Sequence, residues 1–173
     1  MPDAQDDTVP TAEQIAAAWR RELPGARTES IEVITPLWRV AKLLGDERAR
    51  TLARLGIDES TLDLLSTLRR AGHPYELTTR QITTRSLVTA GAISQRLTRA
   101  ESAGLITRAP TTASRRGVLV TLTPAGHELI ERVVRELLEH ETTLTETLTA
   151  AQRTALGEGL RCLAAAVQPE HRI

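Results

Sequence analysis

Helix-start signals recur along most of the chain, and they constrain its fold more than any other feature. Each signal is a hydrophobic staple: a hydrophobic residue, a polar capping residue, and a second hydrophobic residue five positions after the first. The staples lie at Ile57, Asp58 and Leu62, at Leu77, Thr78 and Ile82, and at Val88, Thr89 and Ile93. Capping boxes, in which a threonine is followed three residues later by a glutamine, are predicted for Thr11 with Gln14, Thr78 with Gln81 and Thr149 with Gln152. With the apolar periodicity, these signals predict helices at residues 11–23, 31–54, 58–71, 78–85, 89–103, 124–148 and 149–167.

One β-prone stretch interrupts the predicted helices. The runs 105–109 and 117–122 flank a polar and basic segment at 110–116, which predicts an antiparallel hairpin with a basic tip. A short helix, a tight turn, a second helix and a basic hairpin follow one another in the order of a winged helix-turn-helix. We therefore expect a mainly α fold containing a winged helix-turn-helix with a small antiparallel β-hairpin wing.

The charges are distributed unevenly along the chain. There are 22 basic and 22 acidic side chains, so the formal net charge is zero. Residues 78–122, however, contain seven arginines and one acidic residue, Glu101, and carry a local charge of +6. A local excess of this kind is expected where a protein neutralises DNA phosphates. The alternative interpretation is a solvated amphipathic helix beside an ordinary hairpin.

The predicted helix at 89–103 is the candidate reader of the major groove. Helical phase places Ile93, Leu97 and Ala100 toward the core. The residues predicted to face outward are Ser94, Gln95, Thr98 and Arg99. Glutamine and arginine can make bidentate contacts with adenine and guanine, so Gln95 and Arg99 are the predicted base readers.

Four further residues complete the predicted interface with double-stranded DNA. Arg115 or Arg116, at the hairpin tip, is expected to reach the adjacent minor groove, where narrow segments attract guanidinium groups. Thr89 and Arg80 belong to the same predicted set.

Several other classes of protein are not expected. No nucleophile with a base, no carboxylate pair in a pocket and no phosphate loop is evident, so we expect neither an enzyme nor a cofactor. The four histidines do not stand at metal-site spacing, and no metal is expected. The lone Cys162 is expected to pack as a small hydrophobic residue; its redox activity stays open. No apolar run approaches the roughly 20 residues that span a bilayer, and the polar, acidic start predicts a cytoplasmic location.

The hairpin and the helix after it resemble the MarR family of bacterial regulators. The family pattern is Asp-x-Arg, three residues, then Val-x-Leu-Thr; the matching positions here are Ser114, Arg116, Val120, Leu122 and Thr123. Ser114 stands in place of the family's Asp, a departure that questions the family's Asp-to-Arg brace of the wing. The resemblance covers roughly residues 31–167.

This resemblance implies a homodimer, built by the N- and C-terminal helices, that binds a pseudo-palindromic site. The wide apolar stripe of the helix at 124–148 independently favours a second copy, although a wholly intramolecular bundle is the alternative. The expected organisation is a disordered N-terminus at 1–10, an extra N-terminal helix at 11–30, a dimerisation helix at 31–57, a winged helix-turn-helix lobe at 58–123 and C-terminal dimerisation helices at 124–173.

The extra N-terminal helix resembles that of the urate-responsive PecS- and HucR-like subgroup. This resemblance implies that Trp19 stacks on or donates to the ligand, that Asp63 accepts from its N–H groups and that Arg96 binds its anionic edge, with Arg108 as a fourth candidate. The implied function is a repressor that releases its operator on binding urate or a related purine anion. Alternatives are a regulator responding to phenolic or aromatic carboxylates, and a DNA organiser without sequence preference.

Each ligand candidate also has a structural interpretation. Trp19 can cover the core beside Ile15 and Leu23, Asp63 can pair with a nearby arginine, and Arg96 can contact phosphate.

Overall fold

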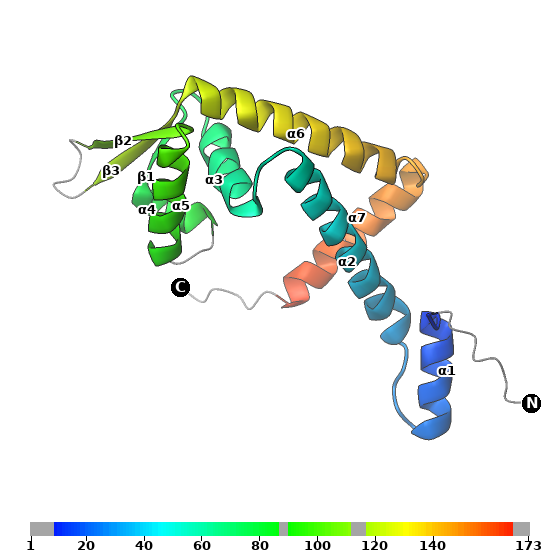
Figure 1. Cartoon of the computed structure of the whole chain (residues 1–173). Coiled ribbons are helices and arrows are strands. Elements are labelled where there is room, and N and C mark those ends of the chain that lie inside the picture. Colours follow the sequence, from blue (N-terminus) through cyan, green and yellow to red (C-terminus); the bar gives the residue numbers. More distant parts are fainter. Residues whose placement is uncertain (1–8, 87–89, 112–116, 168–173) are drawn as a thin grey trace, which may run out of the picture. The chain divides into compact units, whose positions relative to one another are not determined.

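The computed structural model describes residues 9–86, 90–111 and 117–167, and helices dominate them (Figure 1). Within these ranges there are seven helices and three short strands. Their order is α1 (Ala12–Glu22), α2 (Ile31–Arg54), α3 (Glu59–Arg70), β1 (Glu76–Thr78), α4 (Thr79–Ser86), α5 (Ala90–Ser102), β2 (Ile106–Pro110), β3 (Val118–Leu122), α6 (Pro124–Thr145) and α7 (Ala150–Val167). The mainly α class and the hairpin are confirmed. No helix in the described part of the chain is long and apolar enough to cross a membrane.

The chain divides into two compact units, Met1–Arg54 and Leu55–Ile173. In the first unit, α1 begins with the predicted capping box: the Gln14 amide donates to Thr11 Oγ1 over 3.1 Å, and the Thr11 amide donates to Gln14 Oε1 over 2.7 Å. Ala16 is fully buried where α1 packs against α2. Arg20 donates to the buried Thr28 Oγ1 over 3.1 Å, which ties the end of α1 to the loop before α2.

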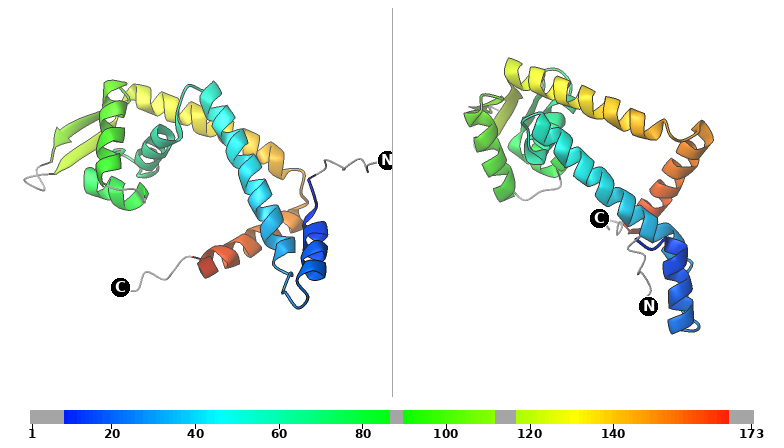
Figure 2. Two further views of the ribbon diagram at one scale, coloured as in Figure 1. Left: turned by 60° about the horizontal axis from the view of Figure 1, so that its bottom comes forward. Right: turned by 45° about the vertical axis from the view of Figure 1, so that its right-hand side comes forward.

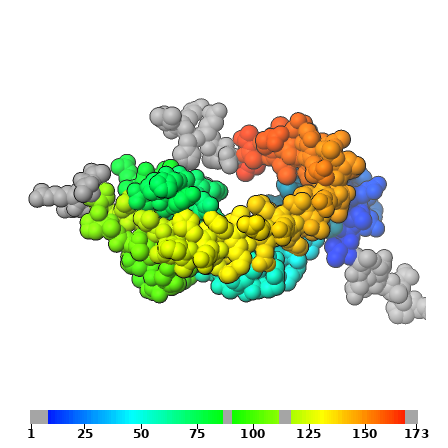
Figure 3. Space-filling model, turned by 90° about the horizontal axis from the view of Figure 1, so that it is seen from above, coloured from blue at the N-terminus to red at the C-terminus, as the bar shows by residue number. Residues whose placement is uncertain are grey.

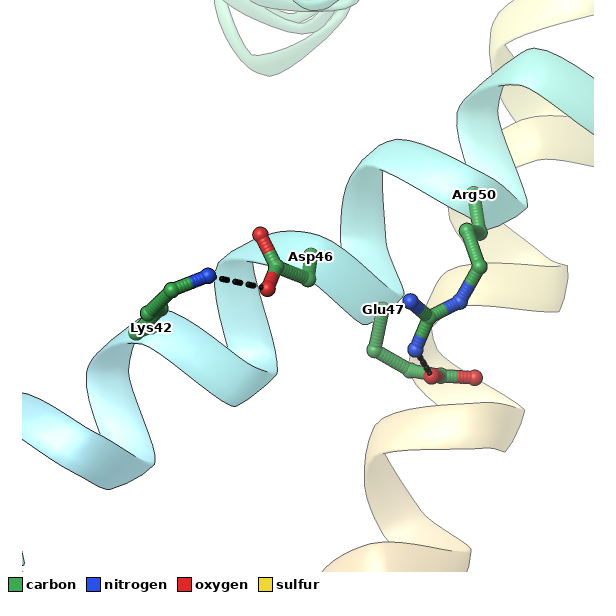
Figure 4. Close-up of polar contacts among 4 residues, drawn as sticks. All are labelled: Lys42, Asp46, Glu47 and Arg50. Carbon is green, nitrogen blue, oxygen red and sulfur yellow. Dashed lines mark hydrogen bonds and ion pairs between the residues drawn. The ribbon is translucent and has the colours of Figure 1, made fainter.

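The polar face of α2 carries ion pairs between successive turns (Figure 4). Lys42 Nζ lies 2.7 Å from Asp46 Oδ2, and Glu47 pairs with Arg50. The hydrogen bond from Lys42 is the main reason that the pKa of Asp46 is lowered. Pairs with this spacing add modest support to a helix. They leave the apolar residues of α2 as a separate, largely exposed group.

The core of the second unit lies among α3, α4, α5, α6 and the sheet. Its fully buried side chains come from every one of these elements: Leu64, Leu65, Leu68, Ile82, Ile93, Ile106, Val120, Ile130 and Val133. Figure 2 shows α3, α4 and α5 gathered beside the strands at the start of α6, and Figure 3 shows them as one packed body. All the buried hydrophobic side chains of the described residues are aliphatic, and the sequence contains no phenylalanine.

The sheet has three antiparallel strands in the order β1-β3-β2. The predicted hairpin is β2 with β3, in a register that sets Ile106 opposite Leu122. Strand β1 was not predicted, because three residues carry too little alternation to be seen in a sequence. Pairing with β3 makes it a strand, and the predicted helix at 78–85 accordingly begins at Thr79, with Thr78 as the last strand residue. The predicted capping box of Thr78 and Gln81 is confirmed.

Helix α6 begins in close contact with the turn between α5 and β2. Thr123 caps α6 through the Gly126 amide over 3.1 Å, and its hydroxyl donates to the Gly104 carbonyl over 2.7 Å. A Cβ at Gly126 would lie 2.1 Å from the Leu105 carbonyl oxygen, so no other residue fits there without a shift of the backbone. The end of α5 and the start of α6 are thus joined at this point.

Helix α6 ends at Thr145, three residues before the predicted end. The Thr145 hydroxyl donates back to the Thr142 carbonyl over 2.9 Å, and Arg153 Nη1 donates to the Leu148 carbonyl over 2.6 Å and to that of Thr145 over 3.2 Å. These bonds satisfy carbonyls that a longer helix would have used. The predicted capping box of Thr149 and Gln152 then starts α7.

Candidate nucleic-acid interface

Helix α5 has one buried face and one exposed face. Ile93, Leu97 and Ala100 are at most 2% exposed, as predicted. Four residues of the helix that were predicted to face outward are all exposed: Ser94, Gln95, Thr98 and Arg99. The buried face packs against α3, α4 and β2, so the exposed polar face is presented on a fixed support. It offers amide, guanidinium and hydroxyl groups, which suit base edges and phosphates.

Helix α4 lies before α5 and adds an exposed arginine. Ile82 is fully buried and anchors α4, while Thr79 Oγ1 donates to the Val118 carbonyl of β3 over 3.4 Å. Arg80, in the first turn, is exposed. Val88 and Thr89, the first two residues of the third predicted staple, fall in the segment 87–89 outside the described residues.

The wing is the hairpin of β2 and β3. Beyond the paired strands, the Thr111 amide donates to the Gly117 carbonyl over 2.9 Å. The predicted minor-groove residues Arg115 and Arg116 lie in segment 112–116, outside the described residues.

The ion pair of Asp63 and Arg96 joins α3 to α5. Arg96 Nη1 donates to Asp63 Oδ2 over 2.9 Å, with the side chains 22% and 38% exposed for Arg96 and Asp63. Asp63 lies between the buried Leu62 and Leu64, and Arg96 directly precedes the buried Leu97. The pair is therefore held at the packed contact between the two helices. The structure brings together two of the four predicted ligand residues, in the arrangement that the structural interpretation of Asp63 described.

A looser contact lies at the start of α3. Arg99 Nη1 is 3.9 Å from Asp58 Oδ2, and both side chains are more than half exposed. Asp58 caps α3, and its carboxylate accepts from the Ser60 hydroxyl and from the amide and hydroxyl of Thr61. The hydrogen bond from Ser60, followed by those from Thr61, lowers the pKa of Asp58 to about 2. Because the contact with Arg99 is long and exposed, the guanidinium stays accessible to DNA.

The fourth predicted ligand residue, Arg108, is paired within the lobe. Arg108, on β2, donates through Nε to Glu101 Oε2 over 2.9 Å and makes a second bond to the same oxygen through Nη2. The hydrogen bond from the guanidinium is the main cause of the lowered pKa of Glu101, and it raises the pKa of Arg108. The sequence offered one clue to this pair, since Glu101 is the single acidic residue of the basic stretch.

Trp19, the remaining predicted ligand residue, belongs to α1 in the first unit. Its side chain is largely uncovered there, at 53% exposure; Ile15 lies one turn earlier on the helix, and Leu23 is the C-cap.

An aromatic cluster links α3, the loop just before β1 and α6, and the sequence did not predict it. The Arg69 guanidinium lies 4.6 Å from the centroid of the Tyr75 ring. The ring of His127 lies edge-on to Tyr75 with its centroid 4.6 Å away, and that of His73 lies 6.0 Å away. Arg69 also donates to Glu131 on α6 over 2.8 and 3.2 Å. Tyr75 has a positive φ of 62°, a conformation in which side chains other than glycine are uncommon. The cluster holds the start of the sheet against α6.

Comparison with known proteins identifies the family. The MarR family model matches residues 55–117. Over 142 residues, the chain is 33% identical to the HTH-type transcriptional regulator PecS of Dickeya dadantii (strain 3937), covering 82% of this chain and 86% of that protein. The chain belongs to the MarR family. It falls in the PecS subgroup, and it is a DNA-binding transcription regulator rather than an enzyme.

Solved MarR-family structures have the same fold. Sco3205 from Streptomyces coelicolor, solved in complex with DNA, has a TM-score of 0.67 at 24% identity and covers 96% of this chain and 94% of its own. A cysteine-to-serine mutant of MarR from E. coli, complexed with operator DNA, has a TM-score of 0.62 at 27% identity, covering 75% of this chain and 94% of its own. Membership of the MarR family and of its PecS subgroup is thus confirmed, together with the winged helix fold.

Proposed function

We propose that this MarR-family protein is a homodimeric repressor that releases a pseudo-palindromic operator when it binds urate or a related purine anion. The observation that carries the proposal is the ion pair of Asp63 and Arg96. Arg96 lies on the helix whose exposed face offers the base-reading groups, so a ligand that engages Arg96 acts directly on the DNA-reading element.

The proposed DNA contacts follow from exposure and chemistry. Gln95 and Arg99 read bases in the major groove, and the neighbouring hydroxyls of Ser94 and Thr98 bind phosphates or bases. The rest of the proposed contact set consists of Thr89, Arg80, Arg115 and Arg116. Two copies related by a two-fold axis would place their recognition helices about 34 to 36 Å apart, which matches inverted half-sites.

The proposed homodimer is supported by apolar side chains that the single chain leaves uncovered. In α7 no described residue is buried, and Leu156 and Leu160 are 52% and 41% exposed. In α2, Trp38 and Leu43 are 71% and 67% exposed. Large uncovered apolar surfaces on helices mark protein–protein contacts, and a second copy of the chain is the occupant expected in this family.

The chemistry of the pair suits a flat anion that carries N–H groups. A guanidinium presents a planar fork to an anionic edge, and a carboxylate accepts from ring N–H donors. Urate provides both complements in one molecule. Because Asp63 and Arg96 satisfy each other over 2.9 Å in the free protein, a ligand that binds both must take the place of that bond.

Replacement of the ion pair provides the proposed switch. The bond between α3 and α5 fixes α5 in the arrangement seen here. A ligand inserted between the two side chains favours a second position of α5. The factor by which operator affinity can fall is limited by how much more tightly the ligand binds this second state than the first. In this proposal Trp19 adds an aromatic face or an N–H donor, and Arg108 becomes available only if it leaves Glu101.

The proposal is tested by footprinting and mobility shifts on DNA upstream of the protein's own gene, over a urate titration. Protection of an inverted repeat that urate relieves is the expected result. Asp63→Asn and Trp19→Ala should bind the operator but respond to urate at least about tenfold less sensitively, the loss expected when charged or stacked contacts are removed. Asp46→Asn is the matched control, since it breaks an exposed Asp–Lys pair on α2.

Each alternative has its own outcome in the same experiment. An unchanged mobility shift across the urate titration refutes the urate response. Release by salicylate but not by urate would favour an aromatic carboxylate effector. Uniform coverage of the DNA, without a protected repeat, would indicate an organiser and contradict the operator-binding repressor.

A further inference from the structure

The outer part of the wing has little support from the core. Strand β2 lies at one edge of the sheet, and only its first residue, Ile106, is buried; Thr107 to Pro110 are exposed. Beyond Ile106, β2 is held by its ladder with β3 and by what its exposed side chains contact. The position of the wing relative to α5 therefore depends on contacts outside the hydrophobic core.

Arg108 makes such a contact, and its partner is on the recognition helix. Its guanidinium donates twice to one carboxylate oxygen of Glu101, which stands in the last turn of α5. Two bonds from one guanidinium restrict its orientation as well as its distance. Arg108 sits in the middle of β2, opposite Val120 of β3, so the contact acts on the hairpin beyond its buried base.

The backbone around Glu101 is itself fixed. Gly104, with a φ of 70°, ends α5: its amide donates to the Glu101 carbonyl over 2.9 Å, and the Leu105 amide donates to Ala100 over 2.9 Å. This is a Schellman motif, a closed end that leaves little freedom to the last turn. Thr123 at the start of α6 also bonds to the Gly104 carbonyl. Glu101 thus projects from a rigid support.

The sequence departs from the family's own wing brace at one position. The MarR pattern has an aspartate two residues before the wing arginine, and Ser114 stands there. Serine has no carboxylate to offer a guanidinium. An acid–base pair between the wing and the rest of the lobe is nevertheless present at a different place, between β2 and α5.

We propose that Glu101 and Arg108 form the wing brace of this protein, and that Glu101 is a positioning residue which sets where the wing meets the minor groove. This proposal rests on the wing contact with DNA proposed above and is independent of urate. In this proposal Arg108 holds the wing. Glu101 promotes DNA binding indirectly, by positioning Arg108, although its own negative charge is repelled by DNA.

The sign of the effect separates a brace from simple electrostatics. Loss of a negative charge near DNA should strengthen binding. A brace predicts the opposite for Glu101→Gln: operator affinity falls about three- to tenfold at fixed salt, and minor-groove protection beside the recognition site is reduced while major-groove protection remains. Glu128→Gln, which removes an exposed carboxylate from α6, is the matched control and should bind as tightly as the wild type or slightly more tightly.

A charge-swapped variant makes the test independent of folding defects. Glu101→Arg combined with Arg108→Glu keeps the net charge and can re-form the pair, so it should recover at least part of the affinity and the minor-groove protection that each single change loses. Thermal unfolding of each variant checks that the lobe is folded. If Glu101→Gln binds and protects the operator as the wild type does, the brace alone is overturned. If the wild-type protein itself gives no minor-groove protection beside the recognition site, the wing contact and the brace are both overturned.

Discussion

Helices α5 and α7 are two amphipathic segments of the same unit with opposite relations to the core. In α5, three apolar residues are buried and the outward face is polar and basic. In α7, leucines recur at helical spacing, yet no residue of the described helix is buried. The first helix packs within the lobe, whereas the described side chains of the second stay uncovered. The difference fits the proposed homodimer, in which a second copy of the chain covers α7.

The largest expected effect comes from changing glycine to alanine at two places, in the packed lobe at the start of α6 and on the uncovered helix α7. Gly126→Ala should lower the free energy of unfolding by about 3 kcal/mol, because its Cβ meets the Leu105 carbonyl and rigid backbone cannot yield. Gly159→Ala on α7 meets nothing within 4 Å and should stabilise the helix by about 0.5–1 kcal/mol. Urea denaturation of both variants measures the contrast. Equal effects would show that the two regions do not differ in packing.

A charge on the apolar face of α7 should act on assembly without harming the lobe. Leu160→Asp places a carboxylate where we propose that a second copy packs, and the dimer dissociation constant should rise about 30-fold, equivalent to about 2 kcal/mol. Sedimentation equilibrium measures this constant. Glu158→Asp, on the same helix, is the control and should leave it unchanged. A Leu160→Asp protein that remains as dimeric as the wild type would contradict the comparison.

A smaller effect is expected on the exposed face of α5. Arg99→Ala should weaken operator binding about tenfold, or about 1.4 kcal/mol, and relax base preference at one position of each half-site, as expected for a lost bidentate contact. The arginine control is Arg27→Ala, which removes an exposed charge from the loop between α1 and α2. Fluorescence anisotropy with a set of single-base operator variants would detect both changes. Uniform weakening at every base would make Arg99 a phosphate contact.

The smallest effect concerns the cap of α3 and its pH dependence. The pKa of Asp58 is about 2 in the folded chain and 3.8 in its ordinary state, so its stabilising contribution is present above pH 3.8 and is lost as the pH falls toward 2. Because the side chain is half exposed, Asp58→Ala should cost no more than about 1 kcal/mol at pH 7 and less at pH 3.

Asp58→Asn separates the cap from the charge, since asparagine caps a helix equally well. Chemical denaturation should therefore show a smaller loss for Asp58→Asn than for Asp58→Ala at pH 7, and the part of the loss that comes from the charge should diminish at pH 3. An equal loss for Asn and Ala at pH 7 would show that the charge, rather than the cap, stabilises α3.

Elements with strong local signals were predictable, and elements set by distant contacts were not. The staples and capping boxes at Asp58, Thr78 and Thr149 placed helix starts within about a residue because capping chemistry is local. Strand β1 depends on pairing with β3, and the end of α6 depends on Arg153 from the next helix. Neither dependence is visible in a window of neighbouring residues.

The candidate sites follow the same rule. Burial along α5 followed from its periodicity, whereas the partners of its charged residues did not. Arg96 and Arg108 were both predicted as ligand residues, but their pairing with Asp63 and Glu101 depends on how α3 and β2 pack on α5. The aromatic cluster around Tyr75 joins two helices and the loop before β1, and the positive φ of Tyr75 has no sequence signal.

The central claim is that one ligand and the operator compete for the state of α5 through Asp63 and Arg96. Reciprocity makes this measurable: calorimetric titration of urate into the free protein and into the protein saturated with operator should give dissociation constants that differ by the same factor by which urate weakens operator binding. That factor should be at least about fivefold in the wild type, the lower end of typical couplings, and close to one in Asp63→Asn. Equal urate affinities with and without operator in the wild type would contradict the account.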